Sequence, residues 1–321
     1  MDISLIAAIL LGLIGLVYSA DWFVEGASDT ARYLHVSPLV IGLIFVGFGT
    51  SAPEMLVAAT AAWNGAPSLA IGNAVGSNIT NLTLILGATA LVSPMVVRSR
   101  IIRRELPVLF VVCCAAYLLM WDGALTVFDG VILLIGLVII IGYTYWEART
   151  HTTDAAAKGL LANHTPKVSR KRAMLNMMVG LVVLIVSSKL LVWGASGVAR
   201  TWGVSELVIG LTIVAIGTSL PELASSFLAA RRGQADLAIG NVVGSNLFNT
   251  LGVLALPGLL APTGMAREVL VRDMPFMLVT TVVVWLMALG YKRLGGISRL
   301  EGLVLLILFI AYQLTLFHTA H

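Results

Sequence analysis

The sequence predicts an all-α polytopic membrane protein, with ten transmembrane helices arranged as two inverted repeats of five helices each. Of the 321 residues, 59% are hydrophobic and only 11% are charged, whereas soluble proteins carry roughly 25% charged residues. The apolar residues fall in runs of about 20, which is long enough to cross a bilayer as helices. The motif Gly-Thr-Ser-x-Pro-Glu also occurs twice, starting at Gly49 and at Gly217.

Apolar segments separated by polar loops define the ten spans. The first repeat, residues 1–146, contains five of them, at 3–24, 38–63, 69–92, 106–121 and 128–146. The second repeat, residues 173–321, contains the other five, at 173–199, 207–230, 237–260, 274–290 and 299–317. The polar residues 147–172 between the repeats carry six Lys and Arg side chains. We expect this segment to be the linker between the two halves.

The distribution of basic residues predicts the orientation of the spans. The linker and the other loops on its side carry 16 of the 20 Lys and Arg residues, and the loops on the opposite side carry 3. Cytoplasmic loops are enriched in Lys and Arg, so the linker should be cytoplasmic and both termini outside. Because five is an odd number, the second repeat enters the membrane from the opposite face, an arrangement found in many secondary transporters. Basic residues confined to such loops give no sign of a nucleic-acid partner.

The repeat extends well beyond one motif. From Gly49 to Asn81, 18 of 33 residues are identical to those 168 positions later. Arg104-Glu105 aligns with Arg272-Asp273 at the same offset, and Asp129-Gly130 aligns with Glu301-Gly302 after a shift of four residues. The repeated residues are mostly polar, which argues against a duplication kept only for packing.

Two prolines predict breaks in the second and seventh spans. Pro53 lacks the N–H that would bond the carbonyl of Gly49, and Pro221 has the same effect on Gly217. Irregular backbone at membrane depth is tolerated only inside the protein or along a water-filled cavity. We expect helices 2 and 7 to be broken near mid-membrane, and helices 3 and 8 as well. The Gly-x-x-x-Gly pairs in spans three and eight, which end at Gly76 and Gly244, predict close helix packing.

Glu54 and Glu222 place a carboxylate inside each broken span. A charge at the bilayer centre costs about 2.5–3.5 kcal/mol on insertion scales, and neither span contains a Lys, Arg or His at that depth. A bound cation or a proton would neutralise each carboxylate. The alternative is a protonated Glu with a purely structural role.

Oxygen-bearing side chains accompany the two acids. Hydroxyls precede each Glu, and Ser and Asn four residues apart share one face of spans three and eight: Thr50, Ser51, Thr218, Ser219, Ser77, Asn81, Ser245 and Asn249. Hard cations such as Ca²⁺ and Na⁺ prefer oxygen ligands, and the lack of Cys and His in these segments argues against zinc or copper. Bonds to the helix's own carbonyls and hydrogen bonds between helices remain the alternatives.

Two further charges lie within the spans of the first and sixth helices. Asp21 aligns with Lys189 at the same offset of 168. We consider both as gate or interface groups. The alternative is that each side chain extends to the nearest membrane surface.

The doubled pattern G-T-S-x-P-E followed by G-N-x-x-G-S-N-x-x-N resembles the α-repeats of the calcium:cation antiporter superfamily, and most closely its bacterial and archaeal sodium/calcium exchangers. The resemblance covers nearly the whole chain. It implies that Ca²⁺ and Na⁺ bind alternately at a central site between spans two, three, seven and eight. It also implies that spans one and six slide across this core to switch access. The implied ligands are the carboxylates of Glu54 and Glu222, the side-chain oxygens of Thr50, Ser51, Ser77, Thr218, Ser219 and Ser245, and backbone carbonyls near Gly47 and Ala215.

One position departs from the family pattern. Some relatives carry Asp where this chain has Asn249, and the equivalent residue Asn81 is also an amide. The site then has two formal charges, enough to neutralise one Ca²⁺ or two Na⁺, and a third Na⁺ would make exchange electrogenic. Protons can replace Na⁺, because a carboxylate also binds a proton.

We therefore expect a secondary active antiporter, active as a monomer in a prokaryotic inner membrane, that exchanges Ca²⁺ for Na⁺ without a cofactor. The first alternative is a proton/calcium antiporter. A cation channel is a different class, but channels usually form a ring of identical subunits. An intramembrane enzyme is disfavoured, because the five His residues fall outside the span interiors and no H-E-x-x-H motif occurs.

Overall fold

The computed structural model describes residues 3–34, 41–96, 104–150, 168–201, 215–289 and 295–319. Its helices in the first part of the chain are α1 (Ile3–Tyr33), η1 (Ile41–Val46), α3 (Gly47–Thr50), α4 (Ala52–Trp63), α5 (Pro67–Thr80), η2 (Asn81–Ile85), α6 (Leu86–Val92), α7 (Leu106–Leu119) and α8 (Val127–Thr150). Those of the second part are α10 (Arg170–Thr201), α12 (Ala215–Thr218), α13 (Leu220–Arg231), α14 (Ala235–Phe248), η5 (Asn249–Val253), α15 (Ala255–Leu260), η6 (Val269–Asp273), α16 (Met274–Leu289) and α17 (Arg299–Thr319). Most of the linker and the expected starts of spans two and seven lie outside the described residues.

The described helices are those of a multi-pass membrane protein. Seven of them are long and apolar enough to cross a membrane, and the bent pair Ile41–Thr50 and Ala52–Trp63 makes an eighth candidate. The apolar helix α7 is shorter, at 14 residues. Large apolar side chains such as Leu10, Leu118 and Ile139 are exposed, as expected for a surface in contact with lipid tails.

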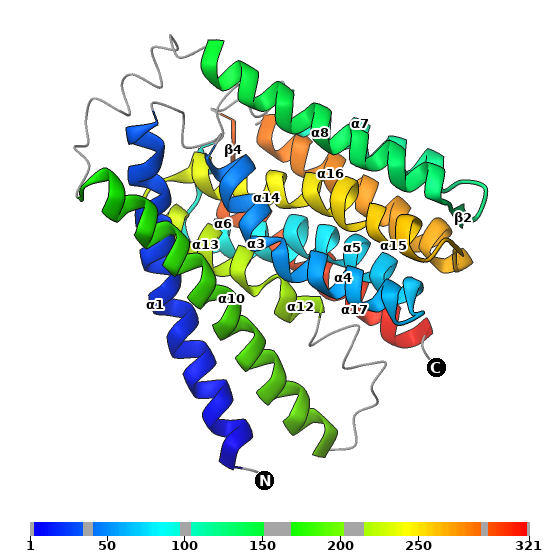
Figure 1. Cartoon of the computed structure of the whole chain (residues 1–321), viewed down its shortest axis with the longest axis horizontal. Coiled ribbons are helices and arrows are strands. Elements are labelled where there is room, and N and C mark those ends of the chain that lie inside the picture. Colours follow the sequence, from blue (N-terminus) through cyan, green and yellow to red (C-terminus); the bar gives the residue numbers. More distant parts are fainter. Residues whose placement is uncertain are drawn as a thin grey trace.

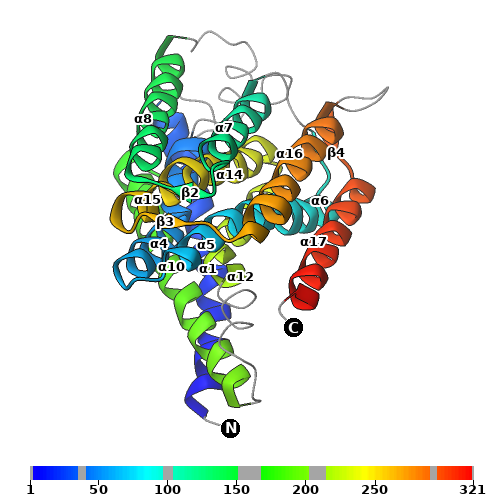
Figure 2. The same ribbon diagram turned by 90° about the vertical axis from the view of Figure 1, so that its right-hand side faces the viewer.

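Two helical segments form the centre of the molecule (Figure 1). Within an apolar 18-residue stretch of each span, 72% of Pro67–Val92 and 89% of Ala235–Leu260 is buried, against 22–33% in the other five unbent candidate spans. The long helices α1 and α10 run antiparallel along one side of this centre, and α7, α8, α16 and α17 cover the other (Figures 1 and 2). The segments that carry the repeated Ser and Asn residues are therefore the most enclosed of the seven candidate spans in the described part of the chain.

The expected break at the first repeated motif is present. The chain bends by 42° between Ile41–Thr50 and Ala52–Trp63, and Pro53 occupies the first turn of α4. In the second copy, α12 ends at Thr218 and α13 begins at Leu220, with Pro221 in its first turn. Proline at the start of a helix costs little, because the missing N–H has no partner there in any case.

The expected breaks in helices 3 and 8 are absent, and this prediction was wrong. Pro67–Val92 and Ala235–Leu260 each run as one helix. A π-helical turn begins at Asn81 in the first and at Asn249 in the second, so each Asn lies where the helix widens. Neither turn contains a proline that would remove a backbone donor, and the N–H of Leu254 bonds the carbonyl of Asn249 at 3.0 Å.

Close helix packing is found around the second Gly-x-x-x-Gly pair, Gly240 and Gly244. A Cβ added at Gly244 would collide with the backbone of Leu43 in η1. No atom of the described chain lies within 4 Å of a Cβ added at Gly72 or Gly76.

Two short antiparallel ribbons join the first part of the chain to the second, at opposite ends of the helix bundle (Figure 1). Strand β1 (Met95–Val96) pairs with β4 (Gly296–Ile297), and β2 (Ala124–Leu125) pairs with β3 (Thr263–Gly264). At the repeat offsets, β1 corresponds to β3 and β2 to β4. The two ribbons are thus equivalent connections.

The helix that follows each ribbon starts with the same cap. Thr126 Oγ1 donates a hydrogen bond of 2.7 Å to Asp129 in the first turn of α8, and Ser298 Oγ donates one of 2.7 Å to Glu301 in the first turn of α17. In both, the backbone N–H of the capping residue also bonds the carboxylate, as in a capping box. This local chemistry explains why Asp129 and Glu301 occupy equivalent positions.

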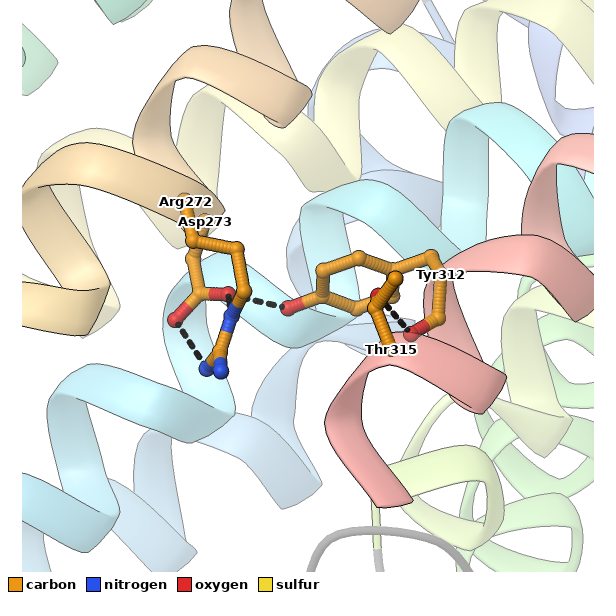
Figure 3. Close-up of polar contacts among 4 residues, drawn as sticks. All are labelled: Arg272, Asp273, Tyr312 and Thr315. Atoms are coloured by element: carbon orange, nitrogen blue, oxygen red, sulfur yellow. Dashed lines mark hydrogen bonds and ion pairs between the residues drawn. The ribbon is translucent and has the colours of Figure 1, made fainter. Parts of the chain in front are cut away.

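A buried polar cluster holds α17 against η6 and α16 (Figure 3). Tyr312 donates a hydrogen bond of 2.9 Å to Asp273, and Arg272 pairs with the same carboxylate at 2.7 Å. The carboxylate of Asp273 therefore has both a charged and a neutral donor within the apolar bundle. Such pairing offsets the cost of burying the charge.

Candidate cation-binding site

The two repeated acids lie at equivalent positions of two helix starts. Glu54 belongs to the first turn of α4 and Glu222 to the first turn of α13. Both side chains are fully buried, at 0% exposure. Each carboxylate lies at the N-terminal end of a helix, where the helix dipole favours negative charge.

Each carboxylate is bound by a hydroxyl from the other half of the chain. Ser51 Oγ donates a hydrogen bond of 3.3 Å to Glu222, and Ser219 Oγ donates one of 3.2 Å to Glu54. Ser51 and Ser219 are equivalent residues, as are the two glutamates. The two half-motifs therefore meet as one pseudo-symmetric cluster.

Two asparagines form the next contacts and also obey the repeat. Asn73 Nδ2 donates a hydrogen bond of 3.4 Å to the backbone carbonyl of Glu54, and Asn241 Nδ2 donates one of 3.2 Å to that of Glu222. Thr218 bonds Asn73 Oδ1 at 3.5 Å, and Thr50 bonds Asn241 Oδ1 at 3.1 Å. Neither asparagine is among the predicted ligands, although both share the polar helix face of Ser77 and Ser245. Their spacing of four residues before Ser77 and Ser245 was the available signal.

Several buried polar atoms of the cluster have no hydrogen-bond partner in the described chain: Glu54 Oε2, Glu222 Oε2, Ser77 Oγ, Asn81 Oδ1 and both polar atoms of the Asn249 side chain. A buried polar atom without a partner costs about 1–3 kcal/mol. Five of these six atoms are oxygens, and all belong to residues predicted as ligands. A hard cation would satisfy such oxygens.

The predicted ligands Thr50, Gly47 and Ser245 lie together where α3 meets α14. Thr50 Oγ1 is 3.3 Å from Ser245 Oγ, and Ser245 Oγ donates to the Gly47 carbonyl at 3.4 Å. The same carbonyl accepts a hydrogen bond of 3.1 Å from the Ser51 N–H. A Cβ at Gly47 would come within 2.9 Å of the Gly244 backbone, so the close contact requires glycine. Ala215, the equivalent of Gly47, is the first residue of α12.

The remaining asparagines connect the two central helices to each other. Asn81 Nδ2 donates a hydrogen bond of 2.9 Å to Asn246, and Asn246 Nδ2 donates one of 3.4 Å to the Asn78 carbonyl. Asn78 Nδ2 reaches Thr250 at 2.8 Å. Asn78 and Asn246 therefore form hydrogen bonds between the two central helices.

The two gating candidates lie on α1 and α10 rather than at the carboxylates. Asp21 forms an ion pair with Arg232, in the turn after α13. Lys189 lines a cavity of about 610 Å³ whose wall also includes Pro53, Gly217 and Thr218. Neither residue contacts Glu54 or Glu222 in the described chain.

The chemistry of the cluster is that of oxygen ligands. Among the described residues, no group of three or more His, Cys, Asp or Glu side chains gathers as a metal site. The cluster instead combines two carboxylates with hydroxyl and amide groups. Fold and cluster together define a class: a helical membrane protein in which two equivalent acidic helix bends meet at the centre.

Comparison with known proteins identifies the family. The chain matches the model of the sodium/calcium exchanger protein family over residues 4–146 and 173–318, and it belongs to this family. It is 45% identical over 310 residues to the putative antiporter CaxA of Alkalimonas amylolytica, covering 96% of this chain and 97% of that one. It is 37% identical over 280 residues to the inner membrane protein YrbG of Escherichia coli, covering 86% of each.

Solved structures of the sodium-calcium exchanger NCX_Mj have the same fold. One, soaked with Na⁺ and Sr²⁺, superposes with a TM-score of 0.84 at 33% sequence identity, covering 97% of this chain and 98% of that one. With the family match and the antiporter relative, this likeness makes the chain a membrane cation antiporter.

Proposed function

We propose that the protein exchanges Ca²⁺ for Na⁺ at a single site shared by Glu54 and Glu222. The observation that carries this proposal is the reciprocal pairing of Ser51 with Glu222 and of Ser219 with Glu54. It makes one cluster from two half-motifs. The unpartnered oxygens Glu54 Oε2, Glu222 Oε2 and Ser77 Oγ are then ligands for the transported ion.

Charge balance supports exchange rather than simultaneous binding. The two carboxylates neutralise one Ca²⁺ or two Na⁺. Binding both kinds of ion at once would leave an uncompensated positive charge in a buried site, which is costly. Ca²⁺ and Na⁺ therefore compete for the same oxygens, and occupancy by one expels the other.

The architecture we propose is ten spans in two inverted repeats, residues 1–146 and 173–321, joined by the basic linker 147–172. The family model matches separately on either side of this linker, and the two β-ribbons and the two helix caps obey the same repeat. The bias of 16 against 3 basic residues between the two sets of loops favours outside termini and a cytoplasmic linker. Inverted repeats suit alternating access, in which two equivalent arrangements open the site to opposite sides.

A proton is the second candidate for the coupling ion. With Asn at both 81 and 249, the site has two carboxylates and no third acid. Two protons would neutralise these carboxylates as well as two Na⁺ would. Sodium is favoured by the hydroxyl and amide oxygens beside the acids, because a proton needs no such shell.

Transport into proteoliposomes tests the proposal. Vesicles loaded with Na⁺ and diluted into Na⁺-free buffer should accumulate ⁴⁵Ca²⁺, and Glu54→Gln or Glu222→Gln should abolish uptake. Glu268→Gln, at an exposed position before η6, is the matched control and should transport normally. Uptake that follows a pH gradient and ignores Na⁺ would replace sodium by protons. Normal uptake by both site variants would refute the site.

A further inference from the structure

Helices α1 and α10 form one body. A Cβ added at Gly26 would lie 2.8 Å from the Ala173 carbonyl, and one at Gly194 would lie 2.7 Å from the Leu5 carbonyl. Gly26 and Gly194 are equivalent residues, and the two backbones approach each other closely at both positions. Figures 1 and 2 show α1 and α10 side by side. Because glycine permits this contact at two separated points, the two helices pack against each other along their length.

This helix pair is tied to the rest of the protein on one side. Asp21 of α1 pairs with Arg232, and Ser28 of α1 accepts a hydrogen bond of 2.9 Å from Gln234. Arg232 and Gln234 flank Gly233, whose φ of 72° forms the tight turn between α13 and α14. The pair therefore makes two polar contacts with one short turn.

The equivalent place on the other side is open. The residues equivalent to Asp21, Arg232 and Gln234 are Lys189, Asn64 and Ala66, and all three line the cavity of about 610 Å³. The cavity reaches Pro53 and Thr218 at the two helix bends. Lys189 makes no ion pair with any residue that the structure describes.

We propose that Asp21–Arg232, together with Ser28–Gln234, is a one-sided latch that holds the cytoplasmic side of the site closed and favours the outward-open state. The sidedness rests on the proposed topology and alternating access. In that topology the α13–α14 turn is cytoplasmic and the turn at Asn64 is extracellular.

The latch is one-sided because the two halves of the chain carry different charges at these equivalent positions. In the opposite state the arrangements of the two halves exchange, so Lys189 would approach Asn64 and Ala66. Neither Asn64 nor Ala66 has a carboxylate, so Lys189 would gain no ion pair there. Asp21 would meanwhile separate from Arg232. The inward-open state thus loses one ion pair and gains none.

Cysteine labelling measures this bias. In a Cys113→Ala/Cys114→Ala background, Thr60→Cys places a reporter in the cavity wall, and a membrane-impermeant maleimide is added outside. Asp21→Asn and Arg232→Gln should each lower the labelling rate about two- to fivefold, the population change expected for one exposed ion pair. Arg231→Gln, on the neighbouring exposed residue, is the matched control and should leave the rate unchanged.

Two further variants separate a latch from general damage. The charge swap Asp21→Arg/Arg232→Asp should restore the parent rate. Asn64→Asp should slow labelling as Asp21→Asn does, because it gives Lys189 a partner when the outer side closes. Parental labelling rates in Asp21→Asn and Arg232→Gln, or a swap that fails to restore the rate, would overturn the latch. The labelling is done without Na⁺ or Ca²⁺ and requires no transport. Its outcome is therefore independent of whether sodium is the coupling ion.

Discussion

The hydroxyl of Ser51 lies 3.3 Å from the carboxylate of Glu222, 171 positions away in the sequence. The equivalent contact, Ser219 to Glu54, is 3.2 Å long. Each half of the chain therefore completes the site of the other. A change in either half should alter a single shared site, and the predictions below follow from this arrangement.

Removing one cross-half hydroxyl should weaken Ca²⁺ binding without abolishing transport. Ser51→Ala and Ser219→Ala each remove one oxygen and one hydrogen bond worth about 1 kcal/mol. We expect the apparent KM for Ca²⁺ to rise by about fivefold in either variant, by similar factors. Ser93→Ala, whose hydroxyl bonds the Ala230 carbonyl outside the site, is the control. A large effect in one serine variant and none in the other would contradict a shared site.

A third carboxylate should strengthen Ca²⁺ binding. Asn249 is fully buried and neither polar atom of its side chain has a hydrogen-bond partner among the described residues, so Asn249→Asp adds a charge to the proposed ion site. Such a charge is worth up to about 4 kcal/mol at 4 Å and an effective dielectric constant of 20, much of it offset by desolvation. We expect the Kd for Ca²⁺, measured by calorimetry, to fall by about tenfold. Asn249→Ser provides the uncharged comparison, and weaker binding by the Asp variant would count against Asn249 as a ligand.

Glycine packing between η1 and α14 should be needed for stability. Gly244→Ala forces a Cβ against the Leu43 backbone, and overpacking of this kind costs about 1–3 kcal/mol. The thermal midpoint of the detergent-solubilised protein should fall by several degrees. Gly142→Ala, at an exposed position of α8 with no described atom within 4 Å of the added Cβ, is the control and should be tolerated. Equal effects of the two would show that this contact does not matter.

The Tyr312–Asp273 hydrogen bond should stabilise the fold but not set ion binding (Figure 3). Tyr312→Phe removes a buried donor from Asp273, with an expected loss of about 1 kcal/mol of stability. Tyr18→Phe, at a position that is 67% exposed, should have no effect in the same thermal assay. A changed Kd for Ca²⁺ in the Tyr312 variant would place this cluster in the site instead.

Much of this fold and site could be predicted from the sequence because the repeat is strict where the chemistry is demanding. Pro53, Glu54 and their equivalents mark buried helix bends, since each is costly in an apolar helix unless it has a role. Span length and loop charge then predict the membrane class. The family follows from the doubled motif.

The remaining features depend on tertiary geometry. π-helical turns at Asn81 and Asn249 occur where breaks were expected. They could not be predicted, because no local sequence pattern distinguishes a π-helical turn from an α-helical one. The roles of Asn73 and Asn241 depend on where the glutamate carbonyls point. The pairing of Asp21 with Arg232 joins residues 211 positions apart, and only the packed structure brings them together.

Equilibrium binding of ⁴⁵Ca²⁺ to the purified protein tests the central claim most directly. A single shared site predicts one Ca²⁺ per chain, displaced by Na⁺, and loss of that binding in either Glu54→Gln or Glu222→Gln. Two independent half-sites would instead bind two Ca²⁺ per chain, with each variant retaining one. That second result would contradict the account.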